Sequence, residues 1–473
     1  MTRTKSVGAS LNRIDAVDKV LGKTSYVDDP TLADCLELAL VLTNEPHGEL
    51  LSLDTSEASA SEGVVCVVTA ADVQGDNQVG CVRPDQPLLV EERVRFVGDR
   101  LALVAAETRL EARRAAAKVK FEIKPLPLVD DPVRALEEDA FELHEGGNLA
   151  LHQKVRRGDL DGLGQENLVE VSDVFKVNYQ EHAYLETQSV VAIPEGDGVR
   201  IIGSLQAPHY VRGAVARVLG LPLSKVTVVQ GNTGGAFGGK EDYPSEPASC
   251  AAVVAMKTGR PVRLVLDRAT DLLVSTKRHR MEMHFSLMAT SEGDIRGANV
   301  DLYVDAGAYL GLSGIVSERA NCTATGPYDI PNVSVDTRVI YTNNLFGGAY
   351  RGFGTPQVVF AMESLMDQLA ARLAICPVEL RRKNLLAVGD ETITGQRMPE
   401  SFPAELTFDE LIAQGRWKEK RAASLKFNEL NARKKRGVGV ATALYGCCLH
   451  AGGQHLEGSG SLVQVNSDGT VQV

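Results

Sequence analysis

The stretch GNTGGAFGGKED, residues 231–242, decides between the folds that are open to this sequence. Residues 234–240 match the phosphate-loop pattern G-x-x-x-x-G-K, but Glu241 follows where such loops have Ser or Thr. A nucleotide loop uses that hydroxyl to bind magnesium, and a carboxylate at this place repels a triphosphate. The dinucleotide pattern G-x-G-x-x-G is absent as well. The loop therefore predicts either close approach of the backbone to a bulky ligand or a tight structural turn.

The bulk composition is that of an acidic globular protein. The chain has 473 residues, of which 44% are hydrophobic and 24% charged, and its net charge is −12. This length predicts about three domains, and the negative charge argues against a nucleic-acid-binding surface. Apolar runs such as LALVAA at 101–106 are too short to span a membrane, and the first residues lack an apolar signal core. We therefore expect a cytoplasmic protein without a membrane segment.

Composition and turn signals divide the chain into domains of α/β (α+β) character. Residues 1–125 are predicted to mix short strands and helices, and residues 126–165, rich in Pro, Gly and acidic residues, are predicted to be a linker. Residues 166–400 alternate longer strands and helices, and residues 401–473 begin a further α/β segment. None of the eight cysteines forms a C-x-x-C pair, so no zinc or iron–sulfur site is predicted within this chain.

Three local patterns bear on the architecture. Residues 208–219 have helical apolar spacing and are followed by Gly220, a natural C-cap. Thr355 and Pro356 are predicted to be the N-cap and first residue of a long helix. The last residues, GSLVQVNSDGTVQV, predict a β-hairpin at the end of the chain. Such a hairpin either finishes a sheet of its own domain or belongs to a domain that another polypeptide completes.

Three further motifs occur with the glycine loop in a fixed order. They are SLQAPH (204–209), SERA (317–320) and GGAYRGFGTPQ, which closes at Gln357. Together they resemble the molybdenum-binding large subunit of the xanthine dehydrogenase/aldehyde oxidase family of molybdenum hydroxylases. The N-terminal section resembles the small α/β "hammerhead" domain of that family, and the resemblance covers essentially the whole chain. It implies that residues 231–242 form an intact molybdopterin-side loop, not a damaged phosphate loop.

The resemblance implies hydroxylation of the carbon next to nitrogen in an N-heterocycle, or oxidation of an aldehyde, with water as the oxygen source. It implies a Mo-molybdopterin cofactor, in its cytosine dinucleotide form, with a sulfido or selenido ligand. The organic part of the cofactor holds the metal, so no protein side chain is expected to ligate it. Glu181, His182 and Glu186 are accordingly expected to be structural. Electrons are expected to leave through 2Fe-2S clusters and FAD in partner subunits.

Four residues match cofactor-binding positions of the family. Gln206 is expected to donate a hydrogen bond near the oxo group of the metal, and Arg351 is expected to line the cofactor pocket. Phe237 and Gly238 are expected to contact the cofactor from the glycine loop. Taken singly these residues have ordinary structural interpretations. Gln206, for example, could cap the helix that follows it.

Glu241 and Arg319 are the candidates for catalysis and substrate binding. Glu241 falls where purine-oxidising members place a substrate-orienting carboxylate, and Arg319 where they place an arginine that stabilises negative charge on the heterocycle. Phe353 matches an aromatic residue that packs against the substrate ring. Taken singly, Arg319 is expected at the surface or in an ion pair, and Phe353 in the core. Glu241 alone could pair with Lys240 or Arg351.

The sequence departs from the family pattern in two respects. It lacks the G-G-x-E-x-G-Q-G and G-x-G-E segments, and the glutamate of the second is the family's proposed general base. We therefore expect the large subunit of a split enzyme, similar to nicotinate dehydrogenases. A medium molybdopterin subunit, a 2Fe-2S small subunit and an FAD subunit are expected as partners. In LYGCCLHAGG, residues 444–453, Leu449 stands where purine-oxidising members have a second aromatic, which makes nicotinate a candidate beside xanthine.

Other functions stay open at this point. The chain could be a xanthine dehydrogenase or aldehyde oxidase-type subunit with a different substrate, or a truncated chain that binds partners without catalysis. An ATP-using enzyme with an altered phosphate loop predicts magnesium-dependent nucleotide binding.

Overall fold

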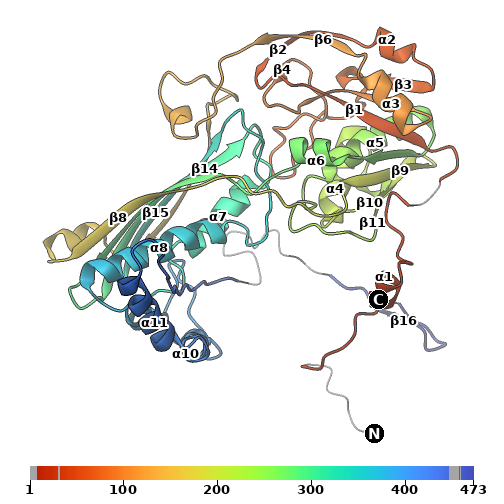
Figure 1. Ribbon diagram of the computed structural model, residues 1–473. Coiled ribbons are helices and arrows are strands. Elements are labelled where there is room, and N and C mark those ends of the chain that lie inside the picture. The colour runs from red at the N-terminus through yellow and green to blue at the C-terminus, as the bar shows by residue number, and fades with distance from the viewer. Residues whose placement is uncertain (1–7, 30–31, 447–457, 459, 473) are drawn as a thin grey trace. The chain divides into compact units, whose positions relative to one another are not determined.

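The structure is a computed structural model that describes residues 8–29, 32–446, 458 and 460–472. The chain forms two compact units (Figure 1). Both units mix helices and strands, as the sequence predicts. Unit 1 comprises Met1–Leu126 and His182–Ser275, and unit 2 comprises Pro127–Glu181 and Thr276–Val473, so the chain passes between the units three times. Across the described part of the chain, no helix is both long and apolar enough to cross a membrane.

Unit 1 contains two sheets. The strand order is β11-β10-β9-β12-β1-β5-β3 in the seven-stranded sheet and β4-β2-β6 in the three-stranded one. Its strands are β1 (Leu36–Leu42), β2 (Gly48–Asp54), β3 (Val64–Val68), β4 (Arg93–Val94), β5 (Arg100–Ala106), β6 (Lys120–Pro125), β9 (Ser189–Glu195), β10 (Gly198–Gly203), β11 (Val226–Gln230) and β12 (Val262–Val265). Its helices are α1 (Ala16–Val20), α2 (Ser56–Ser59), α3 (Arg109–Ala116), α4 (Pro208–Leu219), α5 (Ser245–Thr258) and α6 (Arg268–Val274), with short 3-10 turns at Ala70–Asp72 and Leu223–Lys225.

The core of unit 1 lies around β5 and α5. Every residue of β5 is buried, because β1 and β3 pair with its two edges and α3 packs on it. α5 is buried over most of its length, since the small residues in SEPASCAAVVAMKT let its neighbours approach closely. The buried guanidinium of Arg100 in β5 forms an ion pair with Glu246 in the first turn of α5. The start of α5, which follows the glycine loop directly, is therefore fixed to β5 of the seven-stranded sheet.

Unit 2 is built on a five-stranded sheet with the order β7-β15-β14-β13-β8. Its strands are β7 (Leu149–Arg157), β8 (Val169–Val177), β13 (Met281–Ala289), β14 (Ile295–Gly307) and β15 (Asn332–Tyr341), and the hairpin strands are β16 (Gln464–Val465) and β17 (Val471–Gln472). Its helices are α7 (Ser313–Thr323), α8 (Thr355–Leu373), α9 (Pro377–Asn384), α10 (Ala404–Gln414) and α11 (Trp417–Leu430), with 3-10 turns at Arg134–Leu136 and Asp161–Gln165.

The core of unit 2 lies between this sheet and α7 and α8. β13 alternates buried and half-buried residues, as expected for a strand with one face on the core. α8 lies along the sheet and contacts β8 and β13 (Figure 1). α7 contacts β7, β15 and α8, and nearly all of its residues are buried. A polar side chain carried on α7 is therefore placed in the interior of the unit.

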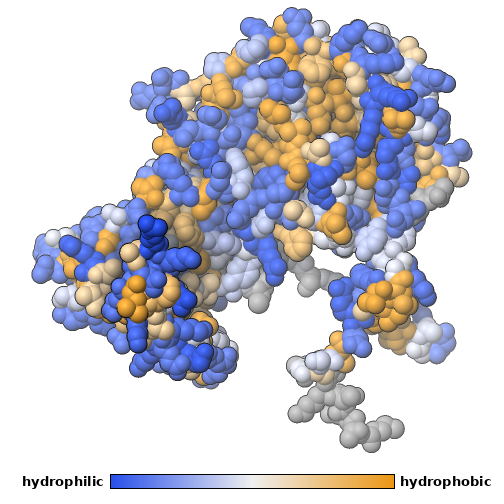
Figure 2. Space-filling model, in the orientation of Figure 1, coloured by the Kyte–Doolittle hydropathy of each residue, from blue (hydrophilic) through white to orange (hydrophobic). Residues whose placement is uncertain are grey.

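α9, α10 and α11 form a smaller cluster at the C-terminal side of α8. Phe408 and Trp417 are buried there against Val378. Figure 2 shows apolar side chains among charged ones over α10 and α11, where leucines such as Leu406 and Leu411 are exposed. The predicted hairpin forms as β16 and β17, and among the described residues these strands pair only with each other.

Some predicted boundaries differ in the structure. α4 ends at Gly220 as predicted, with a φ of 65° in the left-handed region. α8, in contrast, begins at Thr355 itself, because Gly354 takes the N-cap position with a φ of 92° that a β-carbon would strain. Residues 149–157, predicted to be part of a linker, form β7 and pair with β15. This strand escapes prediction because LALHQKVRR is an edge strand of mainly polar residues.

Candidate functional site

The glycine loop of unit 1 packs tightly against the segment that precedes β9. A β-carbon on Gly234 would lie 2.6 Å from the Cβ of Glu186, and one on Gly239 would lie 2.7 Å from the ring of His182. The carboxylate of Glu186 accepts a hydrogen bond of 2.7 Å from the backbone N–H of Gly234. Glycine is required at these positions because the loop backbone touches neighbouring side chains. His182 and Glu186 thus have the structural role that the sequence predicts.

Lys240 is a structural lysine. It is fully buried, and its Nζ lies 3.0 Å from Oε2 of Glu186 and 2.9 Å from Oγ of Ser204. The ammonium also lies 4.8 Å from the centre of the Tyr184 ring. Burial lowers the pKa of Lys240, and the charge of Glu186 opposes that effect. A lysine held in this way does not reach a phosphate, so the phosphate-loop interpretation is wrong.

Gln206 is bound to the glycine loop through its side-chain carbonyl. Its Oε1 accepts hydrogen bonds from the backbone N–H of Gly238 at 3.0 Å and of Lys240 at 3.3 Å. The N-cap of α4 is Ala207, without a side-chain cap, so Gln206 does not cap that helix. Because the carbonyl is used by the loop, the NH2 group remains for another acceptor, and no acceptor for it lies among the described residues.

Phe237 and Glu241 project from this loop. Phe237 has a φ of 56° and its residue is 49% exposed. The left-handed region costs a residue with a β-carbon about 1–2 kcal/mol, so the surrounding loop must hold Phe237 there. Glu241 is half-buried, and its carboxyl has no hydrogen-bond or ion-pair partner within the described ranges. Burial raises the pKa of Glu241 to about 7.

Asp242 adds a second carboxyl at the start of α5. It is 7% exposed, and its Oδ1 has no hydrogen-bond partner in the part of the chain that is described. Burial, and after it the charge of Glu241, raises the pKa of Asp242 to about 7. Adjacent carboxyls that oppose each other's ionisation titrate as a pair. The end of the glycine loop therefore retains a proton near neutral pH.

In unit 2, Arg319 is the central polar residue. It lies on α7 and is 5% exposed, not at the surface as a lone arginine would be. Its guanidinium carbon lies 4.7 Å from the centre of the Tyr445 ring and 5.9 Å from that of Phe353. Its Nη1 donates a hydrogen bond of 3.3 Å to the carbonyl of Gly446. Leu449, predicted to occupy the second aromatic position, lies outside the described residues.

Arg278 supports the A-Y-R-G-F-G loop of unit 2. Its Nη2 donates a hydrogen bond of 2.9 Å to the backbone carbonyl of Arg351, and its guanidinium lies 3.9 Å from the centre of the Tyr350 ring. The side chain of Arg351 itself is exposed, and it has no hydrogen-bond or ion-pair partner among the described residues. The backbone of the loop is thus fixed while the Arg351 guanidinium is available to a ligand.

The two ends of this loop are held by close contacts. A β-carbon on Gly347 would lie 2.3 Å from the ring of His279, and one on Gly354 would lie 2.4 Å from the carbonyl oxygen of Val316 on α7. Burial, and then the charge of Arg278, lowers the pKa of His279 to about 3, so its ring is neutral. Between these contacts Phe353 has a φ of 51°. Both predicted aromatic residues are therefore held in the left-handed region by glycine-rich loops.

Each unit carries a part of the predicted set. In unit 1, Gln206 is hydrogen-bonded to the glycine loop, which carries the other predicted residues of that unit. In unit 2, Arg319 and Phe353 are in contact and Arg351 lies two residues before Phe353 on the same loop. Unit 1 contains Gln206, Phe237, Gly238 and Glu241, and unit 2 contains Arg319, Arg351 and Phe353.

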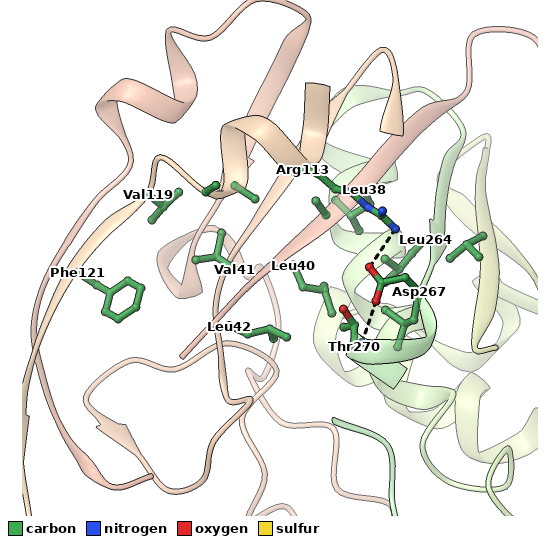
Figure 3. A pocket seen from close by; sticks show the side chains of 15 residues that line it. Leu38, Leu40, Val41, Leu42, Arg113, Val119, Phe121, Leu264, Asp267 and Thr270 are labelled. Atoms are coloured by element: carbon green, nitrogen blue, oxygen red, sulfur yellow. Dashed lines mark hydrogen bonds and ion pairs between the residues drawn. The ribbon is translucent and has the colours of Figure 1, made fainter. Parts of the chain in front are cut away.

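Unit 1 also has a cavity that none of the predicted site residues lines. Figure 3 shows it beside β1, with Arg113 of α3 reaching Asp267 before α6. Its volume is about 350 Å³, and it opens because β1 and β12 pair only through Leu36 and Glu37 and then diverge. Its charged groups, Arg113 and Asp267, lie 3.2 Å apart and neutralise each other. The remaining lining is mainly aliphatic, so the cavity offers little to a reaction.

Three supporting residues are not predicted from the sequence. The sequence indicates Lys240 only as a phosphate ligand or a partner of Glu241, and it singles out neither Arg278 nor Tyr445. The run Thr-Lys-Arg-His-Arg at 276–280, directly before a buried strand, is the signal that could have indicated Arg278. For Tyr445 no local signal exists, because its contact with Arg319 joins distant parts of the chain.

The chain matches three family models in the order of its structure. Residues 21–127 match the aldehyde oxidase and xanthine dehydrogenase a/b hammerhead domain. Residues 143–385 and 410–473 match molybdopterin cofactor-binding domains. No group of His, Cys, Asp or Glu side chains that could hold a metal ion occurs among the residues described.

Known relatives agree with these matches. The chain is 35% identical over 396 residues to the nicotinate dehydrogenase large molybdopterin subunit of Eubacterium barkeri, covering 84% of this chain and 93% of that one. It is 34% identical over 461 residues to a probable xanthine dehydrogenase subunit of Bacillus subtilis, covering 97% of this chain and 60% of the relative. The structure is similar to the aldehyde oxidoreductase of Desulfovibrio desulfuricans, with a TM-score of 0.87 and 30% identity, over 98% of this chain and 52% of that one.

These observations define a mixed α/β chain with a hammerhead domain followed by molybdopterin cofactor-binding domains. The chain belongs to the xanthine dehydrogenase/aldehyde oxidase family of molybdenum hydroxylases.

Proposed function

We propose that this chain is the large molybdopterin subunit of a multi-subunit hydroxylase that oxidises an N-heterocycle, nicotinate or a purine such as xanthine, with water as the oxygen source. The burial of Arg319 and its aromatic neighbours are the main support for this proposal. A buried guanidinium beside the rings of Phe353 and Tyr445 suits a flat ring that bears or develops negative charge. A simple aldehyde offers no such ring to these groups.

Glu241 supports the same class of substrate. Its carboxyl has no partner among the described residues, and burial raises its pKa to about 7. Near neutral pH such a carboxyl can donate a hydrogen bond when protonated and accept one when ionised. Ring nitrogens and exocyclic oxygens of heterocycles need partners of both kinds. We assign Glu241 to substrate orientation and Arg319 to stabilisation of negative charge.

The residues assigned to the cofactor fit an anionic group that carries oxygen and sulfur. Gln206 offers an NH2 donor and Arg351 a guanidinium, and neither group has a partner within the described ranges. When bound, the cofactor would supply the metal centre that transfers oxygen and accepts two electrons. Gln206 and Arg351 would donate hydrogen bonds to it, and Phe237 and Gly238 would contact it from the loop. We also propose the cytosine dinucleotide form of the cofactor with a sulfido or selenido ligand, which the resemblance of the sequence motifs implies.

The partner subunits are also proposed. The chain spans 93% of the nicotinate dehydrogenase large subunit but 34% of a xanthine dehydrogenase of Arabidopsis thaliana. Within the described residues, the hairpin β16–β17 pairs with no other strand, and its two valines, Val465 and Val471, are exposed. We propose that a medium molybdopterin subunit completes this domain, and that 2Fe-2S and FAD subunits accept electrons in the cytoplasm.

The test is native purification of the tagged chain from its own host. Co-purifying subunits are identified, and molybdenum, iron, selenium and the nucleotide released from the cofactor are quantified. Nicotinate and xanthine are then incubated with the complex in ¹⁸O-labelled water. We expect molybdenum, a second molybdopterin subunit and one product that carries ¹⁸O.

The alternatives give different results. Activity toward aldehydes alone would show that the proposed substrate class is wrong, while the assignment as a molybdenum hydroxylase would stand. A chain that purifies alone and without molybdenum, from cells shown to make molybdopterin, would contradict the proposal and support a non-catalytic binding role.

A further inference from the structure

We propose that Tyr445 is a positioning residue whose ring fixes the guanidinium of Arg319 and thereby selects ligands that carry an anionic group. This inference rests on the proposed function, because it takes Arg319 to be a substrate-binding group. Tyr445 matches none of the residues that the family resemblance assigns.

The contacts between Arg319 and the segment of Tyr445 are of two kinds. The guanidinium carbon of Arg319 lies 4.7 Å from the centre of the Tyr445 ring. Nη1 of the same guanidinium donates to the carbonyl of the next residue, Gly446, at 3.3 Å. The ring limits the tilt of the guanidinium plane, and the hydrogen bond limits its rotation within that plane. Two consecutive residues of one segment therefore both help to fix the orientation of the Arg319 guanidinium.

Tyr445 is the stronger of the two aromatic contacts. A cation attracts a ring effectively within about 6 Å of its centre. Phe353, at 5.9 Å, is at that limit, whereas Tyr445 is well inside it. A tyrosine ring also attracts a cation at least as well as a phenylalanine ring does. Loss of the Tyr445 ring should therefore disturb Arg319 more than loss of the Phe353 ring.

The exposure of Tyr445 argues against a purely structural role. The residue is 52% exposed, and its hydroxyl has no hydrogen-bond partner among the described residues. It lies in 437–446, which contains no helix or strand. α7 is held independently of it, since His279 contacts Oγ of Ser313 at 2.8 Å and Gly354 lies so close that an added β-carbon would be 2.4 Å from the carbonyl oxygen of Val316. Replacement of Tyr445 should thus leave α7 in place and release only the end of Arg319.

The test compares two ligands that differ in one charge. Nicotinate and nicotinamide are measured as substrates or as competitive inhibitors of whichever heterocycle the purified complex hydroxylates. For Tyr445→Leu we expect the KM or inhibition constant of nicotinate to rise about five- to thirty-fold, while that of nicotinamide changes less than about two-fold. Tyr445→Phe keeps the ring and should behave like the wild type.

Tyr303→Leu is the matched control. The guanidinium of Arg338 lies 5.3 Å from the centre of the Tyr303 ring in the same unit, and Arg338 also pairs with Asp301. Removing that ring should leave both ligand constants unchanged. Molybdenum content and circular dichroism of each variant show whether it is folded and loaded.

Each result has one consequence. An equal change for both ligands in Tyr445→Leu, or no change for either, would overturn the role of Tyr445 while leaving the proposed function intact. Failure of Tyr445→Phe to restore nicotinate binding would overturn the ring contact as its cause. A wild-type complex that hydroxylates no heterocycle would remove the proposed function and this inference with it.

Discussion

The ammonium of Lys240 and the carboxylate of Glu186 form a largely buried ion pair, with Nζ and Oε2 3.0 Å apart, and Glu186 also holds the backbone N–H of Gly234. One carboxylate therefore binds both ends of the glycine loop. This arrangement fixes the loop without a ligand, so that Phe237 and Glu241 project from a preformed backbone. The lysine that resembles a phosphate ligand in the sequence is the residue that makes the loop rigid.

Lys240→Met should strongly destabilise unit 1. Removing one partner of a buried ion pair leaves Glu186 unpaired, which costs about 3–5 kcal/mol. Urea unfolding of the purified chain measures the change. Lys225→Met is the control, because Lys225 and Asp197 form a 2.7 Å pair that is exposed, and such pairs contribute at most about 1 kcal/mol. Equal effects of the two substitutions would contradict the structural role of Lys240.

Glu241 should make stability depend on pH. Its pKa is raised from 4.5 to about 7 by burial, so the folded chain holds this proton to higher pH than the unfolded chain does. Its contribution is therefore complete below pH 4.5 and is lost as the pH rises toward 7. One carboxyl shifted this far contributes about 3 kcal/mol. In Glu241→Gln the fall in unfolding free energy over this range should be smaller, and Asp242 should account for what remains.

The measurement is a series of urea unfolding curves between pH 4 and pH 8. Glu62→Gln, at an exposed position of the same unit, is the control and should follow the wild type. A Glu241→Gln profile parallel to that of the wild type would show that Glu241 ionises normally in the folded chain.

Gly347→Ala should destabilise unit 2, although alanine usually favours folded structure over glycine. The added β-carbon would lie 2.3 Å from the buried ring of His279, and overpacking of this kind costs about 1–3 kcal/mol. Gly213→Ala in α4 meets no atom within 4 Å and should stabilise unit 1 by about 0.5–1 kcal/mol. Thermal unfolding distinguishes the two. A neutral Gly347→Ala would mean that the loop and His279 separate easily.

At Phe237 we expect the glycine variant to be more stable than the alanine variant, the reverse of the usual order. Because its φ is 56°, alanine keeps the backbone strain and glycine removes it. Phe237→Gly should therefore be more stable than Phe237→Ala by about 1 kcal/mol, and both should lose cofactor contacts and activity. Calorimetry of the two variants, together with their molybdenum content, tests this. Greater stability of Phe237→Ala would show that the loop relaxes once the ring is removed.

Periodicity and turn chemistry predict much of this fold. The helical spacing over 208–219 gives α4, and the turn near the end of the chain gives the hairpin of β16 and β17, because each pattern depends on neighbours in the sequence. The strand over 149–157 is not predicted, since its place at the edge of the five-stranded sheet is a tertiary property. The predicted start of α8 is also wrong by one residue. Gly354 takes the N-cap position, and its close approach to Val316 of α7 is a tertiary contact that the local sequence does not show.

For the candidate site, the sequence predicts residues better than it predicts their contacts. Family motifs indicate Gln206, Glu241 and Arg319, but their chemistry depends on burial and partners that no motif contains. The sequence alone allows Glu241 to pair with Lys240, whereas the structure pairs Lys240 with Glu186. Tyr445 lies far from Arg319 in the sequence, and only the folded chain brings the ring to the guanidinium.

The repeated passage of the chain between the two units has a consequence for synthesis. β1 pairs with β12 through Leu36 and Val262, and the adjoining ion-paired residues Glu37 and Arg263 are 226 residues apart. At about 5–20 residues per second, a ribosome needs roughly 10–45 s to make the intervening chain. During that time one edge of β1 lacks its partner, and the first residues of unit 2 emerge before unit 1 can close. Unit 1 therefore completes its central sheet late in translation, and neither unit can be expressed as one continuous fragment.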